Sequence, residues 1–276
     1  MIIKKKAIIF GAGTLGKDIF DKICLSHEVI CYWDNHKTGS LNGVPICTPK
    51  CDIDFDIVYL ASTHKEMYNQ LLDLGIPDSK IDKYFIEHPY IVRNKWLENY
   101  KELLVNLNCE GALCEAGVYK GDFASYINSV FPDDVLYLFD TFEGFDSKDV
   151  DIEESKSYSC AEIGQFSDTS AEYVMGRMSN PQNVIIVKGY FPDSAKERNI
   201  NERFKFVNLD MDLYKPTLEG LRLFSNKMVR NGVILVHDYF THYEGIHEAV
   251  HEFLKERNDL RLIPIGDEMS IAITGF

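Results

Sequence analysis

The chain has 276 residues, of which 45% are hydrophobic, so it can form packed cores, and two domains are expected rather than disorder. Its formal net charge is −14: residues 1–100 hold 12 basic and 13 acidic groups, whereas the remaining residues hold 17 basic and 30 acidic groups. This acidic excess repels nucleic acid and anionic membranes, which favours a small-molecule substrate.

The N-terminus and the cysteines indicate a cytoplasmic protein. The first residues, MIIKKKAIIFGAG, lead directly into a predicted strand, without a long apolar segment or a cleavage site. Seven scattered cysteines in such a chain are typical of reduced thiols. Cys47 and Cys51 are close, but a zinc site would need a second ligand pair, so buried or loop cysteines are the simpler interpretation.

Residues 1–88 predict a small Rossmann-like α/β domain. Apolar runs at 7–10 and 29–33 flank a helical pattern, and together they form a βαβ unit. A strand at 57–61 and a helix at 65–74 repeat the alternation.

The turn after the first strand of this domain is rich in glycine. Gly11, Gly13 and Gly16 form a full GxGxxG between a strand and a helix. Asp34 follows the next strand, where it can meet a ribose hydroxyl. Only about two and a half βαβ repeats are present, fewer than a complete dinucleotide fold needs. A nucleotide or nucleotide-sugar site and a purely structural module therefore both stay open.

Residues 89–109 predict a connecting helix, and residues 110–276 predict a second, larger α/β domain. Its apolar runs alternate with helical segments and end with two strands around a GDE turn. The expected fold is a mostly parallel sheet closed by an antiparallel hairpin strand. The predicted strands are 111–116, 135–139, 183–187, 206–209, 233–236, 260–264 and 270–273.

A polar, acidic segment at 145–169 interrupts this alternation. Long irregular insertions in compact domains are often lids or binding loops. A plain solvated excursion is the alternative interpretation.

A second glycine turn follows the first strand of the larger domain, in CEAGVYKG. Gly117 and Gly121 let the backbone approach a ligand closely, and Glu115 can accept a hydrogen bond from an amino group. Asp140, at the end of the following strand, can receive both hydroxyls of a ribose. This layout suits S-adenosylmethionine, because its positive charge and amino group favour acids over phosphate-binding amides.

Two further stretches stand at predicted strand ends: LDMDLYKPT at 209–217 and VHDY at 236–239. Together with CEAGVYKG, FDTFEGF and KGYFPDS, in the same order, they resemble the macrocin O-methyltransferase family of sugar methyltransferases, over roughly residues 110–257. The resemblance implies a Rossmann-like, S-adenosylmethionine-dependent enzyme that methylates a hydroxyl of a sugar or nucleotide-linked sugar.

The resemblance also implies roles for the strand-end residues. Asp210 and Asp238 correspond to metal ligands and Asp212 to the general base, which an alcohol needs because it is a poor nucleophile at neutral pH. His237 departs from the family, since it stands where the first aspartate of a pair is usual. His237 is a candidate metal ligand or catalytic group. An imidazole in place of a carboxylate makes Mg a less suitable ion, so the site is expected to hold Mn or no metal. A histidine that only bonds within the strand end fits the sequence equally well.

Weaker candidates lie in or between the same motifs. Tyr214 and Tyr239 are expected to line the acceptor pocket, although core packing is the commoner fate of tyrosine. A homo-oligomer is also expected, because assemblies are common among such enzymes. Contacts with the cofactor or with a lid are expected from Thr141, Asp168, Lys188 and Gly189.

Rival interpretations come from other classes. His247, Glu248 and His251 spell HEAVH, the zinc-peptidase signature, but the helix also carries apolar residues at core spacing and few residues follow it. A metal-independent N-methyltransferase acting on a small amine would explain His237. A non-catalytic nucleotide-sugar binding protein would leave the clustered acids unused, although their mutual repulsion costs stability.

Overall fold

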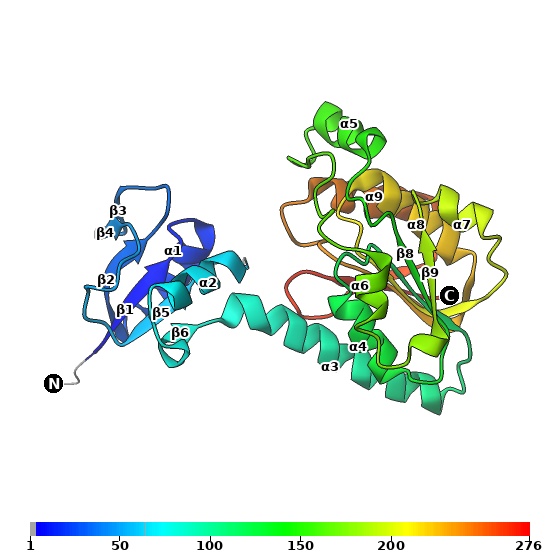
Figure 1. Cartoon of the computed structure of the whole chain (residues 1–276), viewed down its shortest axis with the longest axis horizontal. Helices are drawn as coiled ribbons and strands as arrows, with labels where there is room; N and C mark the ends of the chain where they lie inside the picture. The colour runs from blue at the N-terminus through cyan, green and yellow to red at the C-terminus, as the bar shows by residue number, and fades with distance from the viewer. Residues whose placement is uncertain (1–3, 64) are drawn as a thin grey trace. The chain divides into compact units, whose positions relative to one another are not determined.

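The computed structural model describes residues 4–63 and 65–276 (Figure 1). The chain separates into two compact units, Met1–Ile91 and Val92–Phe276. The boundary falls inside helix α3 (Tyr84–Asn106), which starts earlier than the predicted connecting helix. Among the described residues, no helix is both long enough and apolar enough to cross a membrane.

Unit 1 is built on a six-stranded sheet in the order β3-β4-β2-β1-β5-β6. The predicted strands correspond to β1, β2 and β5, whereas the sequence does not predict β3, β4 and β6, because runs of two to four residues show too little periodicity. Helix α1 covers one face of the sheet and α2 the other. The elements are β1 (Lys5–Phe10), α1 (Thr14–Ile23), β2 (His27–Trp33), β3 (Gly39–Leu41), β4 (Val44–Cys47), β5 (Ile57–Leu60), α2 (Lys65–Asp73) and β6 (Ile81–Asp82).

Of the three predicted glycines, Gly11 and Gly13 lie in the turn between β1 and α1, and Gly16 lies in the first turn of α1. Gly11 has a φ of +116°, and Gly13 directly precedes α1. A Cβ at Gly16 would lie 2.0 Å from the carbonyl oxygen of Gly11. The turn therefore requires glycine for its own geometry, whether or not it binds a ligand.

Asp34 holds this turn in place. Its Oδ2 accepts the N–H of Ala12 at 2.9 Å, and its Oδ1 accepts the N–H groups of His36 and Lys37, each at 2.9 Å. These backbone bonds occupy three of about four acceptor positions of the carboxylate. A ribose hydroxyl would have to share Asp34 with the turn.

Unit 2 contains a seven-stranded sheet in the order β12-β13-β11-β10-β7-β8-β9. β13 is antiparallel to both neighbours, and the other pairs are parallel, so the predicted sheet with its closing hairpin is confirmed. The strands are β7 (Ala112–Ala116), β8 (Leu136–Asp140), β9 (Val184–Lys188), β10 (Phe204–Leu209), β11 (Met228–Val236), β12 (Arg261–Pro264) and β13 (Ile271–Thr274).

Helices cover both faces of this sheet (Figure 1). Alternate residues of β7 point to opposite faces: Cys114 joins the core under α7, α8 and α9, and Leu113 joins the core under α3, α4 and α6. Strands buried on both faces explain the continuous apolar runs in the sequence. The helices are α4 (Asp122–Val130), α5 (Ser147–Lys156), α6 (Ala171–Met175), α7 (Asp193–Glu197), α8 (Tyr214–Ser225) and α9 (Glu244–Glu256).

Candidate active site

The candidate site lies at the carboxyl ends of the neighbouring strands β7 and β10. The chain continues from β7 to β8 on one side and from β10 to β11 on the other, and ligands of open parallel sheets bind at such a switch point. Gly117, just after β7, has a φ of +85°, and a Cβ there would lie 1.9 Å from the carbonyl oxygen of Asp210. Glycine therefore allows the two strand ends to touch.

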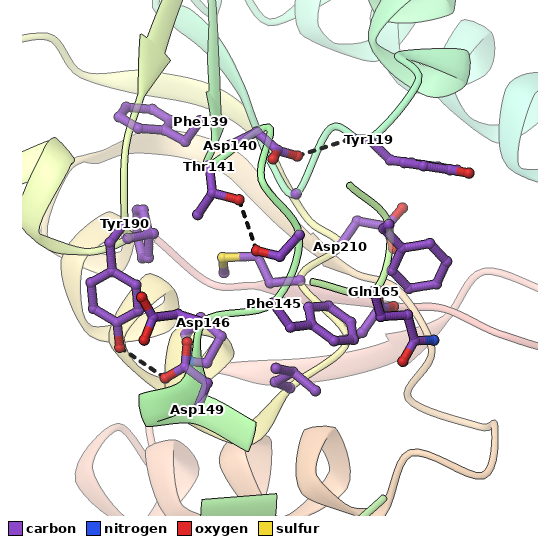
Figure 2. A pocket seen from close by; sticks show the side chains of 18 of the residues that line it. Tyr119, Phe139, Asp140, Thr141, Phe145, Asp146, Asp149, Gln165, Tyr190 and Asp210 are labelled. Carbon is purple, nitrogen blue, oxygen red and sulfur yellow. Dashed lines mark hydrogen bonds between the residues drawn. The ribbon is translucent and has the colours of Figure 1, made fainter. Parts of the chain in front are cut away.

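A pocket of about 640 Å³ opens at this point (Figure 2). As far as the structure describes the chain, its lining contains no lysine, arginine or histidine. Carboxylates and the faces of aromatic rings both attract a cation, so this pocket favours a positively charged ligand. The five lining carboxylates are Asp140, Asp146, Asp149, Asp210 and Asp212, and the six aromatic rings are Tyr119, Phe139, Phe145, Phe166, Tyr190 and Phe191.

Asp140 connects the end of β8 to the glycine turn of β7. Its Oδ2 accepts the N–H groups of Val118 and Tyr119 at 2.7 and 2.8 Å. Its Oδ1 accepts the N–H of Phe142 at 2.7 Å, which leaves about one acceptor position for a ligand hydroxyl. Asp34 plays the same part in the turn of unit 1.

The acidic insertion at 145–169 forms one wall of the pocket (Figure 2). Its helix α5 is anchored by Glu153, which is buried and accepts the N–H of Tyr214, the first residue of α8, at 2.8 Å. A carboxylate at a helix N-terminus is stabilised by the helix dipole. The structure therefore supports a binding loop over a solvated excursion. The insertion residues that line the pocket are Phe145, Asp146, Asp149, Gln165 and Phe166.

Asp149 makes the stability of this wall depend on pH. Burial raises the pKa of Asp149 to about 6; the Tyr190 hydroxyl, which donates to it at 2.8 Å, opposes the rise. Asp146 and Glu153 add to the rise, and Lys215 opposes it. The folded state holds the proton on Asp149 more tightly than the unfolded state does. The protonated carboxyl group therefore adds most to the free energy of unfolding below about pH 4, and this stabilisation is lost as the pH rises through about 6.

Asp149→Asn, which keeps an acceptor for the Tyr190 hydroxyl, is therefore expected to stabilise the protein in neutral solution. We expect the free energy of unfolding to rise by about 1–3 kcal/mol above pH 6, and to change little near pH 4. Urea unfolding of both proteins at pH 4 and pH 8 measures the difference. A change of the same size at both pH values would show that the ionisation of Asp149 is not its cause.

Three donor groups cluster at the ends of β10 and β11. The Nδ1 of His237 lies 3.0 Å from Oδ1 of Asp210 and 2.7 Å from Oδ2 of Asp238. In octahedral coordination, neighbouring donor atoms that each lie about 2.1 Å from the metal ion are about 3 Å from one another. The distances in this cluster therefore fit a first-row divalent ion. The nitrogen donor favours Mn or a softer ion over Mg.

The predicted base, Asp212, lies beside this cluster. Burial, and then the carboxylate of Asp238, raise the pKa of Asp212 well above its usual value. Such a shift makes the ionised carboxylate a stronger base toward a hydroxyl. Asp212 and Asp238 both adopt left-handed backbone, with φ of +60° and +57°. Aspartate tolerates this conformation, which is common at functional sites.

Arg93 is part of the site although the sequence does not predict it. It extends from α3, is 4% exposed, and places Nη1 3.4 Å from Oδ2 of Asp210. Its guanidinium also stacks 4.2 Å from the ring centre of Phe123. Burial alone would raise the pKa of Asp210, but His237 and then Arg93 hold it below the usual value. Asp210 therefore stays ionised beside Arg93 and His237.

Glu115 lies within the sheet and does not line the pocket. Its Oε1 accepts a hydrogen bond at 2.9 Å from the side chain of Asn208, its register neighbour on β10. Burial, and then the charge of Asp210, raise the pKa of Glu115 to about 8. Through Oε1, Glu115 therefore links β7 to β10, whereas its Oε2 is buried without a hydrogen-bond partner among the described residues, and a contact with the amino group of a ligand stays a prediction.

A comparison with sequence models of protein families identifies the family. The sequence model of the macrocin-O-methyltransferase (TylF) family matches residues 91–268. The chain belongs to this family. It is therefore a methyltransferase, and the Rossmann-like methyltransferase fold predicted for unit 2 is confirmed.

Solved methyltransferase structures share this fold. The O-methyltransferase NovP superposes with a TM-score of 0.54 at 21% identity, over 67% of this chain and 79% of NovP. The calicheamicin methyltransferase CalS11 superposes with a TM-score of 0.56 at 17% identity, over 77% of this chain and 91% of CalS11. No match was found among curated protein sequences.

The structure brings only part of the predicted methyltransferase site into the pocket. Asp168 is exposed; it accepts a hydrogen bond from the Tyr119 hydroxyl at 2.7 Å and so ties the insertion to the glycine turn. Lys188 pairs with Glu143 at 3.0 Å and lines a neighbouring hollow. Six predicted residues line the pocket, namely Gly117, Asp140, Thr141, Gly189, Asp210 and Asp212, and six others do not, namely Glu115, Gly121, Asp168, Lys188, His237 and Asp238.

The two tyrosines predicted for the acceptor pocket do not line it. The hydroxyl of Tyr214 donates to Glu252 at 2.6 Å, and its ring packs against the core. Tyr239 lines a separate hollow together with Phe240. The strand-end motifs place both residues near the site in sequence, but the first turn of α8 and the loop after β11 direct their rings elsewhere.

Replacing Arg93 tests its place in the methyltransferase site. Arg93→Met removes the cation from a buried pair, and we expect it to lower the free energy of unfolding by about 3 kcal/mol, because Asp210 loses one of its two partners. Turnover should fall as well. Arg93→Lys should restore part of both. Urea unfolding and kcat, measured on the same preparations, test the prediction; wild-type stability and kcat in Arg93→Met would contradict it.

Proposed function

We propose that this enzyme transfers a methyl group from S-adenosylmethionine to a hydroxyl of a sugar or nucleotide-linked sugar. The observation that carries the proposal is the pocket at the switch point, with its five carboxylates and six aromatic rings. Such a lining attracts a sulfonium and an amino group and repels phosphate. The acceptor class rests on the family, which the sequence motifs identify as one of sugar methyltransferases.

Different pocket residues bind different parts of S-adenosylmethionine. Gly117 lets the ligand approach the backbone, and Asp140 keeps one acceptor position for a ribose hydroxyl. Thr141 and Gly189 also line the pocket. Gly121, Asp168 and Lys188 act indirectly, by supporting the turns and the insertion.

The reaction needs alignment and a base. S-adenosylmethionine supplies a methyl group on a sulfonium, which is already electrophilic. Asp212 accepts the proton of the acceptor hydroxyl as its oxygen attacks, a contribution worth about 10²–10⁴-fold in rate. The pocket aligns the reactants, which reduces the entropic cost of the encounter.

A divalent ion, Mn in preference to Mg, would be held by Asp210, His237 and Asp238. When bound, it would stabilise the negative charge that develops on the acceptor oxygen. The donor atoms of these three residues lie within 4.8 Å of one another, which supports such a set, whereas Arg93 beside Asp210 weakens the affinity of the set for a cation. His237 can instead supply positive charge itself, because the Asp210 and Asp238 carboxylates outweigh burial and raise its pKa well above the usual value.

The proposal is tested with the purified protein and labelled S-adenosylmethionine. We expect saturable binding, and a mass gain of one methylene on a sugar or nucleotide-linked sugar. A methyl group found on nitrogen would instead support the amine alternative, and no binding of S-adenosylmethionine would refute the proposal. Loss of turnover with EDTA, restored by Mn, would support the metal; turnover unchanged by EDTA would assign the cationic role to His237 and Arg93.

Three further expectations remain proposals. The free thiols of all seven cysteines support a cytoplasmic enzyme.

A homo-oligomer is expected because such enzymes commonly form assemblies, and light scattering measures the oligomeric state. The glycine turn of unit 1 is proposed to bind a nucleotide, and competition with Asp34 for the Ala12 N–H predicts weak affinity.

A further inference from the structure

A second group of metal-ligating side chains lies on α9, apart from the residues assigned to methyl transfer. His247, Glu248 and His251 each offer a donor atom, and these atoms all lie within 4.8 Å of one another. Positions 247 and 251 are one helical turn apart, as are 248 and 251, so one face of the helix presents all three. The two imidazole rings are 4.0 Å apart between centres.

Packing of the helix does not explain this group. The inward face of α9 is formed by Ile246, Ala249, Val250 and Phe253, all buried, whereas the three donors are exposed. Two of the donors also line a surface hollow of about 620 Å³ together with Tyr239. Solvent, and therefore a solvated ion, has access to them.

Tyr239 orients one of the histidines. Its hydroxyl lies 3.1 Å from Nε2 of His251, and its ring is 4.9 Å from that of His247. When Nε2–H donates to the Tyr239 oxygen, Nδ1 of His251 keeps its lone pair for a cation. Metal-bound histidines commonly donate their other N–H in this way.

We propose that His247, Glu248 and His251 form a surface binding site for a borderline divalent ion of the Zn²⁺ type. Two imidazoles and one carboxylate suit Zn²⁺, Ni²⁺ or Cu²⁺, whereas Mg²⁺ and Ca²⁺ require mainly oxygen donors. Glu248 serves as a ligand here, unlike the glutamate of the peptidase signature, which acts as a base. The site binds an ion at the end of the loop that follows β11, and it needs no peptide-cleaving chemistry.

The test is calorimetric titration of Zn²⁺ into the full chain. All variants carry His237→Ala, so that the Asp210 cluster loses a ligand and does not supply the same signal. We expect one Zn²⁺ per chain, and at least about tenfold weaker binding in His251→Ala, since losing even an orienting partner costs about 10–100-fold. Tyr239→Phe should weaken Zn²⁺ binding less than His251→Ala does, because it removes a residue that only orients a ligand.

His242→Ala is the matched control, because His242 is an exposed histidine beside the site that offers no donor to it. Its affinity for Zn²⁺ should equal that of the background. Equal affinity of His251→Ala and His242→Ala, or no binding of Zn²⁺ by the background protein, would overturn the proposal. Thermal melts of each variant confirm that a loss of binding is not a loss of folding.

Discussion

Asp212→Asn is expected to lower kcat by about 10²–10⁴-fold while leaving the affinity for S-adenosylmethionine nearly unchanged. Asparagine keeps the size of the side chain and an acceptor oxygen, but it cannot take a proton from the acceptor hydroxyl. The neighbouring carboxylate of Asp238 also stays in place. The loss should therefore appear in the chemical step and not in cofactor binding.

The measurement pairs a titration of S-adenosylmethionine with single-turnover rates. Single-turnover rates separate the chemical step from product release. Asp193→Asn, an exposed acid on α7, is the control for a general effect of lost negative charge. Turnover of Asp212→Asn at the wild-type rate would remove Asp212 from the mechanism, and weakened cofactor binding with unchanged kcat would make it a binding residue instead.

The sheet of unit 2 could be predicted because its central strands are buried on both faces. They therefore appear as continuous apolar runs, and parallel strands place the residues that follow them at one edge. This edge is where a pocket is expected to form. The residues expected around it, because each directly follows a predicted strand, were Gly117, Asp140 and Asp210. The short strands β3, β4 and β6 carry no such signal, since their identity comes from pairing partners far along the chain.

The remaining part of the site depends on contacts that local patterns do not encode. Arg93 lies 117 residues before Asp210 and occupies one position of a long helix, so only the packing of α3 on the sheet reveals it. Glu153 belongs to an acidic run that is typical of a solvated loop, yet it is buried because the N-terminus of α8 binds it. Glu115 ends up bonded to Asn208 of β10, a partner 93 residues away that the local sequence does not indicate.

Gly117→Ala is expected to destabilise unit 2 by about 5 kcal/mol or more, in the range that marks a direct structural conflict. The new Cβ would lie 1.9 Å from the carbonyl oxygen of Asp210, and this neighbour is backbone, which cannot rotate away. The ends of β7 and β10 would have to separate. Because these strand ends carry the glycine turn and Asp212, any protein that still folds should bind S-adenosylmethionine poorly.

Gly164→Ala separates the two causes of this loss. Gly164 has a φ of +76°, close to that of Gly117, but a Cβ there would meet nothing within 4 Å. It therefore reports the cost of the left-handed backbone alone, about 1 kcal/mol. Urea unfolding of both variants, followed by cofactor titration, measures the difference. If the two variants lose the same stability, the close contact between the ends of β7 and β10 is not what requires glycine at position 117. The two strand ends would then be able to move apart at no cost in stability.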